Sequence, residues 1–126
     1  MNRRQVTTIG LLLALTVLPI SYAAPPAGAG VEVDYLLGFV KSSGCQFFRN
    51  DTWYDAASAE QHLRQKYDWL VARDQVRTAE DFIEKAATKS SLSGRGYWIR
   101  CHADAPEPSS QWLRGVLARY RLTAVK

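Results

Sequence analysis

The chain has 126 residues, of which 47% are hydrophobic and 22% charged, with 16 lysines and arginines against 12 acidic residues. This composition excludes a disordered chain, and the length admits one domain with a modest core. The excess of positive charge is small and forms no concentrated basic stripe, so we expect no nucleic-acid partner.

The N-terminus has the pattern of a secretory signal peptide. Arg3 and Arg4 precede an uncharged apolar run over 6–20, and residues 21–23 (Ser-Tyr-Ala) place small side chains where a signal peptidase reads them. The run is shorter than the roughly 20 residues that span a bilayer. We therefore predict a signal peptide over 1–23, bacterial export to the periplasm or the medium, and no stable membrane anchor after cleavage. Without Arg3 and Arg4, 14 basic residues remain against 12 acidic ones.

The rest of the chain predicts a flexible leader over 24–30 and a single domain over 31–122. The hydrophobic pattern predicts, in chain order, a helix over 31–42, short strands over 45–49 and 52–54, helices over 56–72 and from 79, a strand over 96–101, a loop over 102–108 and a last helix capped by Ser109 or Ser110. The order α-β-β-α-α-β-α indicates an α+β domain, with a small three-stranded antiparallel sheet packed against about four helices.

Local signals support several of these boundaries. Asn50-Asp51, between two aromatic runs, is typical of a hairpin turn. Asp55 is positioned to cap the long helix, and Thr78-Ala79-Glu80-Asp81 resembles a capping box at the start of the next helix.

The two cysteines, Cys45 and Cys101, predict one disulfide in an exported protein. They would join the start of the first strand to the end of the third. Their wide separation disfavours a redox pair, which is usually Cys-x-x-Cys. A zinc site made of both cysteines with His62 and His102 would lack a close pair of ligands. We expect no metal and no cofactor.

The long helix carries a polar cluster that predicts a candidate site. His62 and Lys66 are one helical turn apart, and Trp69 and Arg73 lie on the same side. In the catalytic hypothesis His62 is a general base, Lys66 or Arg49 holds an anion, and Glu80 orients the imidazole. The nucleophile would be a serine of the loop that follows the helix predicted from residue 79, and the candidates are Ser90, Ser91 and Ser93. The alternative is a solvated helix face with a polar network that fastens this loop, since no serine-hydrolase motif is present.

Two further features bear on binding. Arg95 and the serine loop could cradle an anion, but the loop follows a helix C-terminus, so serines capping the chain are the other interpretation. Tyr97 and Trp98 are neighbours on a strand and must point to opposite faces. One of them is therefore either exposed for a partner or covered by a terminal helix.

Several segments together resemble a family of small bacterial periplasmic proteins known only as a domain of unknown function. They are the residues 45–50 (CQFFRN), 62–67 (HLRQKY), 78–83 (TAEDFI), 90–94 (SSLSG) and 97–101 (YWIRC). The family usually has Asn-Gly where this chain has Asn50-Asp51. The resemblance implies the compartment and the single domain, and it carries no catalytic residue over.

From these features we expect a non-enzymatic binding or accessory module for an envelope protein or a cell-wall-derived ligand. Its predicted binding residues are Arg49, Lys66, Trp69, Arg95 and Trp98. The alternative is a small periplasmic hydrolase that uses His62 with a serine of the 90–93 loop.

Overall fold

The computed structural model describes residues 10, 14–18 and 27–124. Most of the predicted signal peptide, and residues 24–26 of the predicted leader, lie outside this part of the chain. Within it, no helix is both long and apolar enough to cross a membrane.

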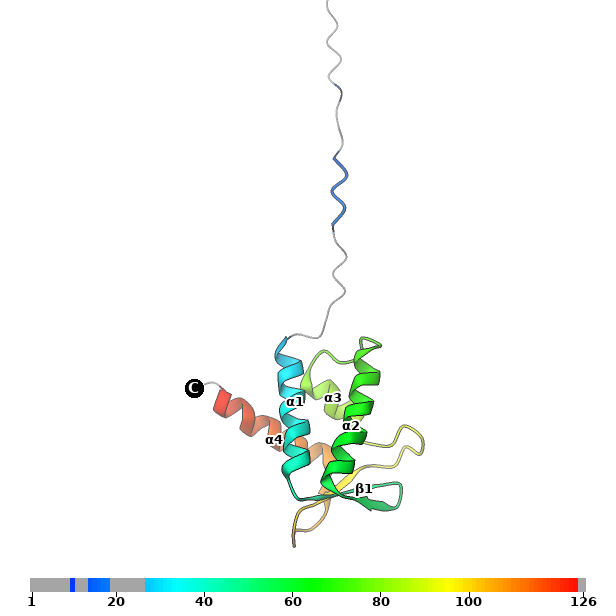
Figure 1. Cartoon of the computed structure of the whole chain (residues 1–126), viewed down its shortest axis with the longest axis vertical. Helices are drawn as coiled ribbons and strands as arrows, with labels where there is room; N and C mark the ends of the chain where they lie inside the picture. Colours follow the sequence, from blue (N-terminus) through cyan, green and yellow to red (C-terminus); the bar gives the residue numbers. More distant parts are fainter. Residues whose placement is uncertain (1–9, 11–13, 19–26, 125–126) are drawn as a thin grey trace, which may run out of the picture.

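A small antiparallel sheet lies at one end of the four helices (Figure 1). The elements are α1 (Ala27–Ser42), β1 (Gln46–Arg49), β2 (Thr52–Tyr54), α2 (Ala56–Val71), α3 (Ala79–Ala86), β3 (Trp98–Arg100), β4 (Glu107–Pro108) and α4 (Ser109–Ala124). The α+β class is confirmed. Two boundaries differ from the sequence-based expectation, because α1 already begins at Ala27, inside the predicted leader, and α4 extends to Ala124.

The sheet has the strand order β2-β1-β3-β4, so the prediction of three strands was wrong by one. The fourth strand is the two-residue Glu107–Pro108, which pairs with β3 inside the predicted loop. A pair this short, with a proline that lacks an N–H donor, has no strand pattern in the sequence. The predicted turn at Asn50 and Asp51 is confirmed, and both residues have the positive φ that a type I′ turn requires.

The two faces of the sheet have different environments. Phe47 of β1 pairs with Ile99 of β3, and both are buried toward the helices. The next pair, Phe48 and Trp98, lies on the opposite face because side chains alternate along a strand. Trp98 is 42% exposed, whereas the preceding Tyr97 is buried. Of the two aromatic neighbours in the predicted strand over 96–101, Trp98 is therefore the exposed one.

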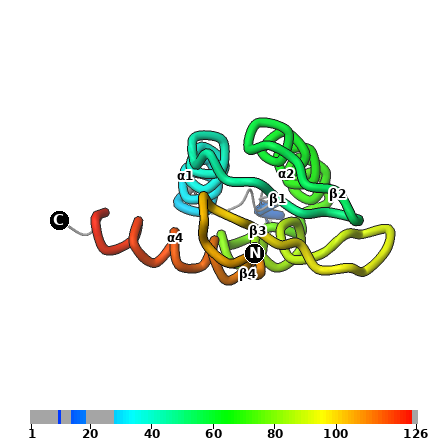
Figure 2. Tube along the Cα trace, turned by 90° about the horizontal axis from the view of Figure 1, so that it is seen from below, coloured from blue at the N-terminus to red at the C-terminus, as the bar shows by residue number. Residues whose placement is uncertain are grey.

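The helices are held by local caps and by apolar burial. Asp55 accepts a hydrogen bond from the Ser58 N–H at the start of α2, and Thr78 forms a complete capping box with Asp81 at the start of α3. All four helices and the sheet contribute buried side chains to the core, and Leu36 and Phe82 are among the largest that are fully buried. In the view of Figure 2, α1 and α2 lie beside each other above the strands.

One arginine joins three helices. Arg121 of α4 bonds to both Glu32 of α1 and Glu80 of α3 (the Arg121 cluster). The two carboxylates raise the pKa of Arg121. This side chain is therefore an ion-paired cross-link between helices.

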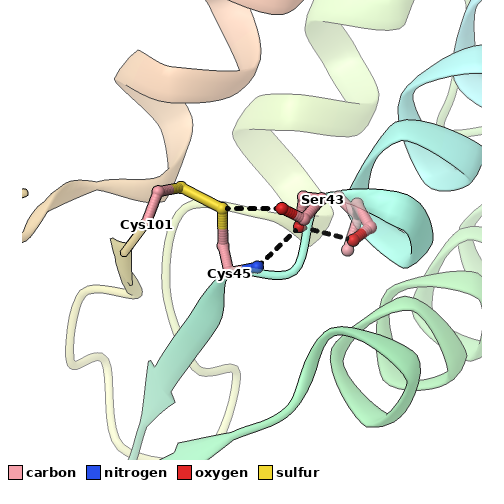
Figure 3. Close-up of a disulfide and its surroundings, with 4 residues drawn as sticks. Ser43, Cys45 and Cys101 are labelled. Carbon is pink, nitrogen blue, oxygen red and sulfur yellow. Dashed lines mark hydrogen bonds between the residues drawn. A yellow bond between two sulfur atoms is a disulfide. The ribbon is translucent and has the colours of Figure 1, made fainter. Parts of the chain in front are cut away.

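The predicted disulfide between Cys45 and Cys101 is present, and it closes a separation of 56 residues (Figure 3). The cysteines flank the ladder in which Gln46 pairs with Arg100, so the bond joins the ends of β1 and β3. The Cys45 N–H also donates to the Ser43 hydroxyl at 3.1 Å. Because the two sulfurs bind each other, they are not available as thiolate ligands for the zinc site considered above.

Candidate functional site

Four polar side chains converge between the hairpin and α2, and we call them the basic cluster: Arg49, His62, Lys66 and Tyr97. Arg49 ends β1 and shares the helix-facing side of the sheet with Phe47, two residues earlier. His62 and Lys66 lie one turn apart on α2. Tyr97 reaches the cluster from the residue before β3, so three separate segments build the site.

Arg49 and His62 are in direct contact. The Nη1 atom of Arg49 lies 3.0 Å from Nδ1 and 3.1 Å from Nε2 of His62. A guanidinium can only donate, so the imidazole nitrogen that it contacts must accept. The two ring nitrogens are almost equally close to the guanidinium, so either one can be the acceptor.

The phenol oxygen of Tyr97 lies close to two side-chain nitrogens of α2. Nε2 of His62 lies 3.3 Å from it, and Nζ of Lys66 donates to it at 3.3 Å. The same ammonium donates to the Lys89 carbonyl at 3.1 Å. The Tyr97 oxygen thus connects both α2 side chains to the segment before β3.

The cluster perturbs the ionisation of its members. Burial, followed by the charges of Arg49 and Lys66, lowers the pKa of His62 to about 4. Burial and the charge of Arg49 lower the pKa of Lys66 to about 8. Burial raises the pKa of Tyr97. Near neutral pH the cluster thus holds two cations, a neutral imidazole and a neutral phenol.

Neither cation has a carboxylate partner. Among the described residues, no acidic side chain lies within 4.0 Å of the Arg49 guanidinium or the Lys66 ammonium. Two partly buried positive charges without a counter-charge are electrostatically costly. An anion placed beside them would remove that cost.

Two cavities open beside the cluster, and His62 lines both of them. The first, of about 160 Å³, lies between Arg49, Tyr54, Leu63 and Tyr97. The second, of about 300 Å³, is lined by His62, Gln65, Lys66, Trp69, Leu70, Lys85 and Ser91. There is therefore room for a ligand on both sides of the imidazole.

The serine loop is fastened to the hairpin turn. The Asn50 amide donates to the Ser90 hydroxyl at 3.3 Å and accepts from the Ser93 hydroxyl at 2.6 Å. Ser90 is buried, and its oxygen also accepts from the backbone N–H groups of Leu92 and Ser93. Ser90 therefore accepts hydrogen bonds from N–H groups of the loop, whereas the sequence suggested that the serines cap free carbonyl groups.

Other predicted site residues lie in different surroundings. Arg95 forms an ion pair with Asp51 of the hairpin turn. Glu80 bonds to Arg121, so the proposed acid of a triad is bound elsewhere. Ser91 lines the second cavity together with His62 and Trp69. Trp98 lies on the outer face of the sheet.

The structure adds residues that sequence reasoning did not assign to the site. Tyr97 is the hub of the cluster, and strand alternation allowed it to point inward without saying which of Tyr97 and Trp98 does so. Tyr54 lines the first cavity and carries the Arg49 guanidinium 5.1 Å from its ring centre. Lys85 and Lys89 lie in the α3 segment and after it, and no motif connects them to α2. Among the described residues, no three histidine, cysteine or acidic side chains are grouped to hold a metal ion.

Comparison with known proteins gives one match. The model of a family of unknown function (DUF5329) matches residues 28–121, which is most of the chain and all of the site. No curated protein and no solved structure shows significant similarity to the chain.

Proposed function

We propose that this chain, which belongs to a family of unknown function (DUF5329), is an exported, non-catalytic binding module that holds an anionic ligand at the basic cluster. The observation that carries the proposal is the pair of uncompensated cations, Arg49 and Lys66, at the junction of two cavities. The bacterial envelope and cell wall contain anionic molecules. The proposal therefore specifies the charge of the ligand that we expect this module to bind.

The donors around the junction suit an anion. Arg49 offers guanidinium N–H groups, and Lys66 offers an ammonium. Hydrogen bonds from charged donors are the strong ones in proteins. Tyr54, Ala59 and Leu63 add apolar surface beside these donors.

The same geometry disfavours the hydrolase. His62 contacts Arg49 and Tyr97, and these neighbours stabilise no imidazolium, which a general base must become. Glu80, the proposed orienting acid, binds Arg121. Ser91 shares a cavity with His62 but has no base positioned by a carboxylate. Binding is thus the function that the site supports best.

Export is the second part of the proposal. It is supported by the apolar N-terminal run and by the disulfide, which persists in oxidising compartments. N-terminal sequencing of the protein recovered from the periplasm or the medium should begin at residue 24. Recovery of only the full-length chain in the cytoplasm would contradict export.

Anion binding can be tested with acetate and inorganic phosphate as probes. We expect titration of the 15N-labelled protein at pH 6.5 to shift resonances of His62 and Tyr97, and R49Q to weaken binding at least about tenfold, as loss of a charged hydrogen bond implies. The affinity should also fall as the pH rises through about 8, where Lys66 loses its proton. R114Q, on the exposed surface of α4, is the matched control. Shifts scattered over the surface, or equal in R49Q, would refute the site.

A further inference from the structure

A third cavity extends the basic cluster along α2. It has a volume of about 470 Å³ and shares Leu70, Lys85 and Ser91 with the second cavity. The first and second cavities share His62. The three cavities thus lie next to one another in the order first, second, third, and we call this series, from Tyr54 to Gln75 and Gly94, the groove.

The length of the groove exceeds that of a small anion. Its wall on α2 runs from Ser58 to Leu70, and a helix of that span rises about 18 Å. An extended peptide covers the same distance with about five or six residues, at roughly 3.3 Å each. The groove is therefore suited to a chain.

Positive charge continues along the groove. Lys85 and Lys89 line its far part, and neither has a carboxylate within 4.0 Å among the described residues. With Arg49 and Lys66, four cations face one carboxylate, that of Glu84. Leu63, Leu70 and the rings of Tyr54 and Trp69 add apolar surface to the groove beside these charges.

The aromatic rings favour a peptide over a sugar chain. The Arg73 guanidinium lies 3.8 Å from the centre of the Trp69 ring, and Arg49 lies 5.1 Å from that of Tyr54. Lys66 lies 5.0 Å from the centre of the Tyr97 ring, so each of these three aromatic rings already has a cation on one face. This leaves less flat aromatic surface for stacking a pyranose, while the cations remain available to carboxylates.

We propose that the groove binds an extended acidic segment of a partner protein, with acidic side chains at Arg49–Lys66 and Lys85–Lys89 and apolar side chains between them. This inference rests on the proposed function, because one of its acidic groups occupies the basic cluster. It adds that a second charged subsite lies beyond Leu70 and that the ligand is a polypeptide.

The experiment compares three probes by isothermal titration calorimetry with the disulfide-bonded protein. They are a blocked seven-residue peptide of alternating Glu and Leu, N-acetylglutamate, and an oligomer of glucuronic acid. We expect the peptide to bind at least about tenfold tighter than N-acetylglutamate, because it occupies both subsites. The peptide with Gln in place of Glu should lose this gain.

The double variant K85Q/K89Q separates the two proposals. It should weaken peptide binding about five- to tenfold, as loss of two exposed ion pairs implies, and leave N-acetylglutamate unchanged. R114Q/R119Q, on α4, is the charge-matched control. Peptide and N-acetylglutamate binding with equal affinity would overturn the extended groove and leave the anion site intact. Tighter binding of the glucuronate oligomer would overturn the peptide assignment, and no binding of any probe would refute the anion site as well.

Discussion

Two arginines of this chain have opposite surroundings. Arg121 lies between two carboxylates, from Glu32 and Glu80, and so joins three helices. Arg49 contacts His62, and its charge lowers the pKa of Lys66. Among the described residues, no carboxylate forms an ion pair with Arg49. A paired cation stabilises the fold, whereas an unpaired one beside a cavity costs free energy that a ligand can offset. The difference separates a charge that stabilises the fold from one that the proposed function assigns to ligand binding.

The disulfide offers the largest effect on both regions, because it closes the β1–β3 ladder. C101S, or reduction of the native protein, should destabilise the fold by about 4 kcal/mol in the chain-entropy model. Thermal melts with and without reductant measure this. Since Arg49 ends β1, probe binding should weaken in the same variant. An unchanged Tm, or free thiols in the exported protein by mass spectrometry, would contradict the role of the bond.

Replacing Lys66 tests the cost of the unpaired cations. K66M should abolish the pH dependence of acetate binding near pH 8 and weaken binding about tenfold or more, as loss of a charged hydrogen bond implies. The Tm should not fall, because the variant removes a partly buried charge that Arg49 repels. Differential scanning calorimetry and titration calorimetry give the two quantities. A large loss of Tm would assign Lys66 to the structural charges instead.

Replacing Arg121 tests the other side of the comparison. R121Q should lower the stability by about 1 kcal/mol, the sum expected of two exposed ion pairs, and leave acetate affinity unchanged. Urea denaturation at low and high salt measures the change, which should shrink as salt screens the pairs. R119Q, two residues earlier on α4, is the control. Equal denaturation midpoints for R121Q and wild type would show that the helices do not need this cross-link.

A further effect concerns pH. The pKa of folded His62, about 4, lies below its ordinary value of 6.5, so the unfolded chain binds the proton more readily between these values. The contribution of His62 to stability is therefore complete above pH 6.5 and is lost as the pH falls through about 4. NMR titration of the imidazole measures the pKa, which R49M should raise. A His62 pKa near 6.5 in the wild-type protein would mean that the basic cluster does not form.

Much of the fold followed from local patterns. Asp55 and Thr78 marked the starts of α2 and α3, and Asn50-Asp51 marked the hairpin, because capping and turn chemistry depend on neighbouring residues. β4 was missed, since a two-residue strand exists only through its partner. The start of α1 was missed because a segment of alanine, glycine and proline shows no amphipathic helical pattern. The stability of this part of the helix comes from packing.

The candidate site was only partly predictable. Helical spacing placed His62 and Lys66 together, since residues one turn apart are neighbours in any α-helix. Arg49 and the serines were considered with them as hypotheses. Tyr97 was not, because its direction depends on which face of the sheet the helices cover.

The sequence by itself determined the class of fold, the disulfide partners and the one-turn pair on α2. These depend on periodicity, on local hydrogen bonds and on there being two cysteines. Only the tertiary structure decided that Glu80 pairs with Arg121, that Arg49 lacks an acidic partner among the described residues, and that three cavities share lining residues. Charge pairing between distant segments depends on how the helices pack onto the sheet, and no local pattern records that packing.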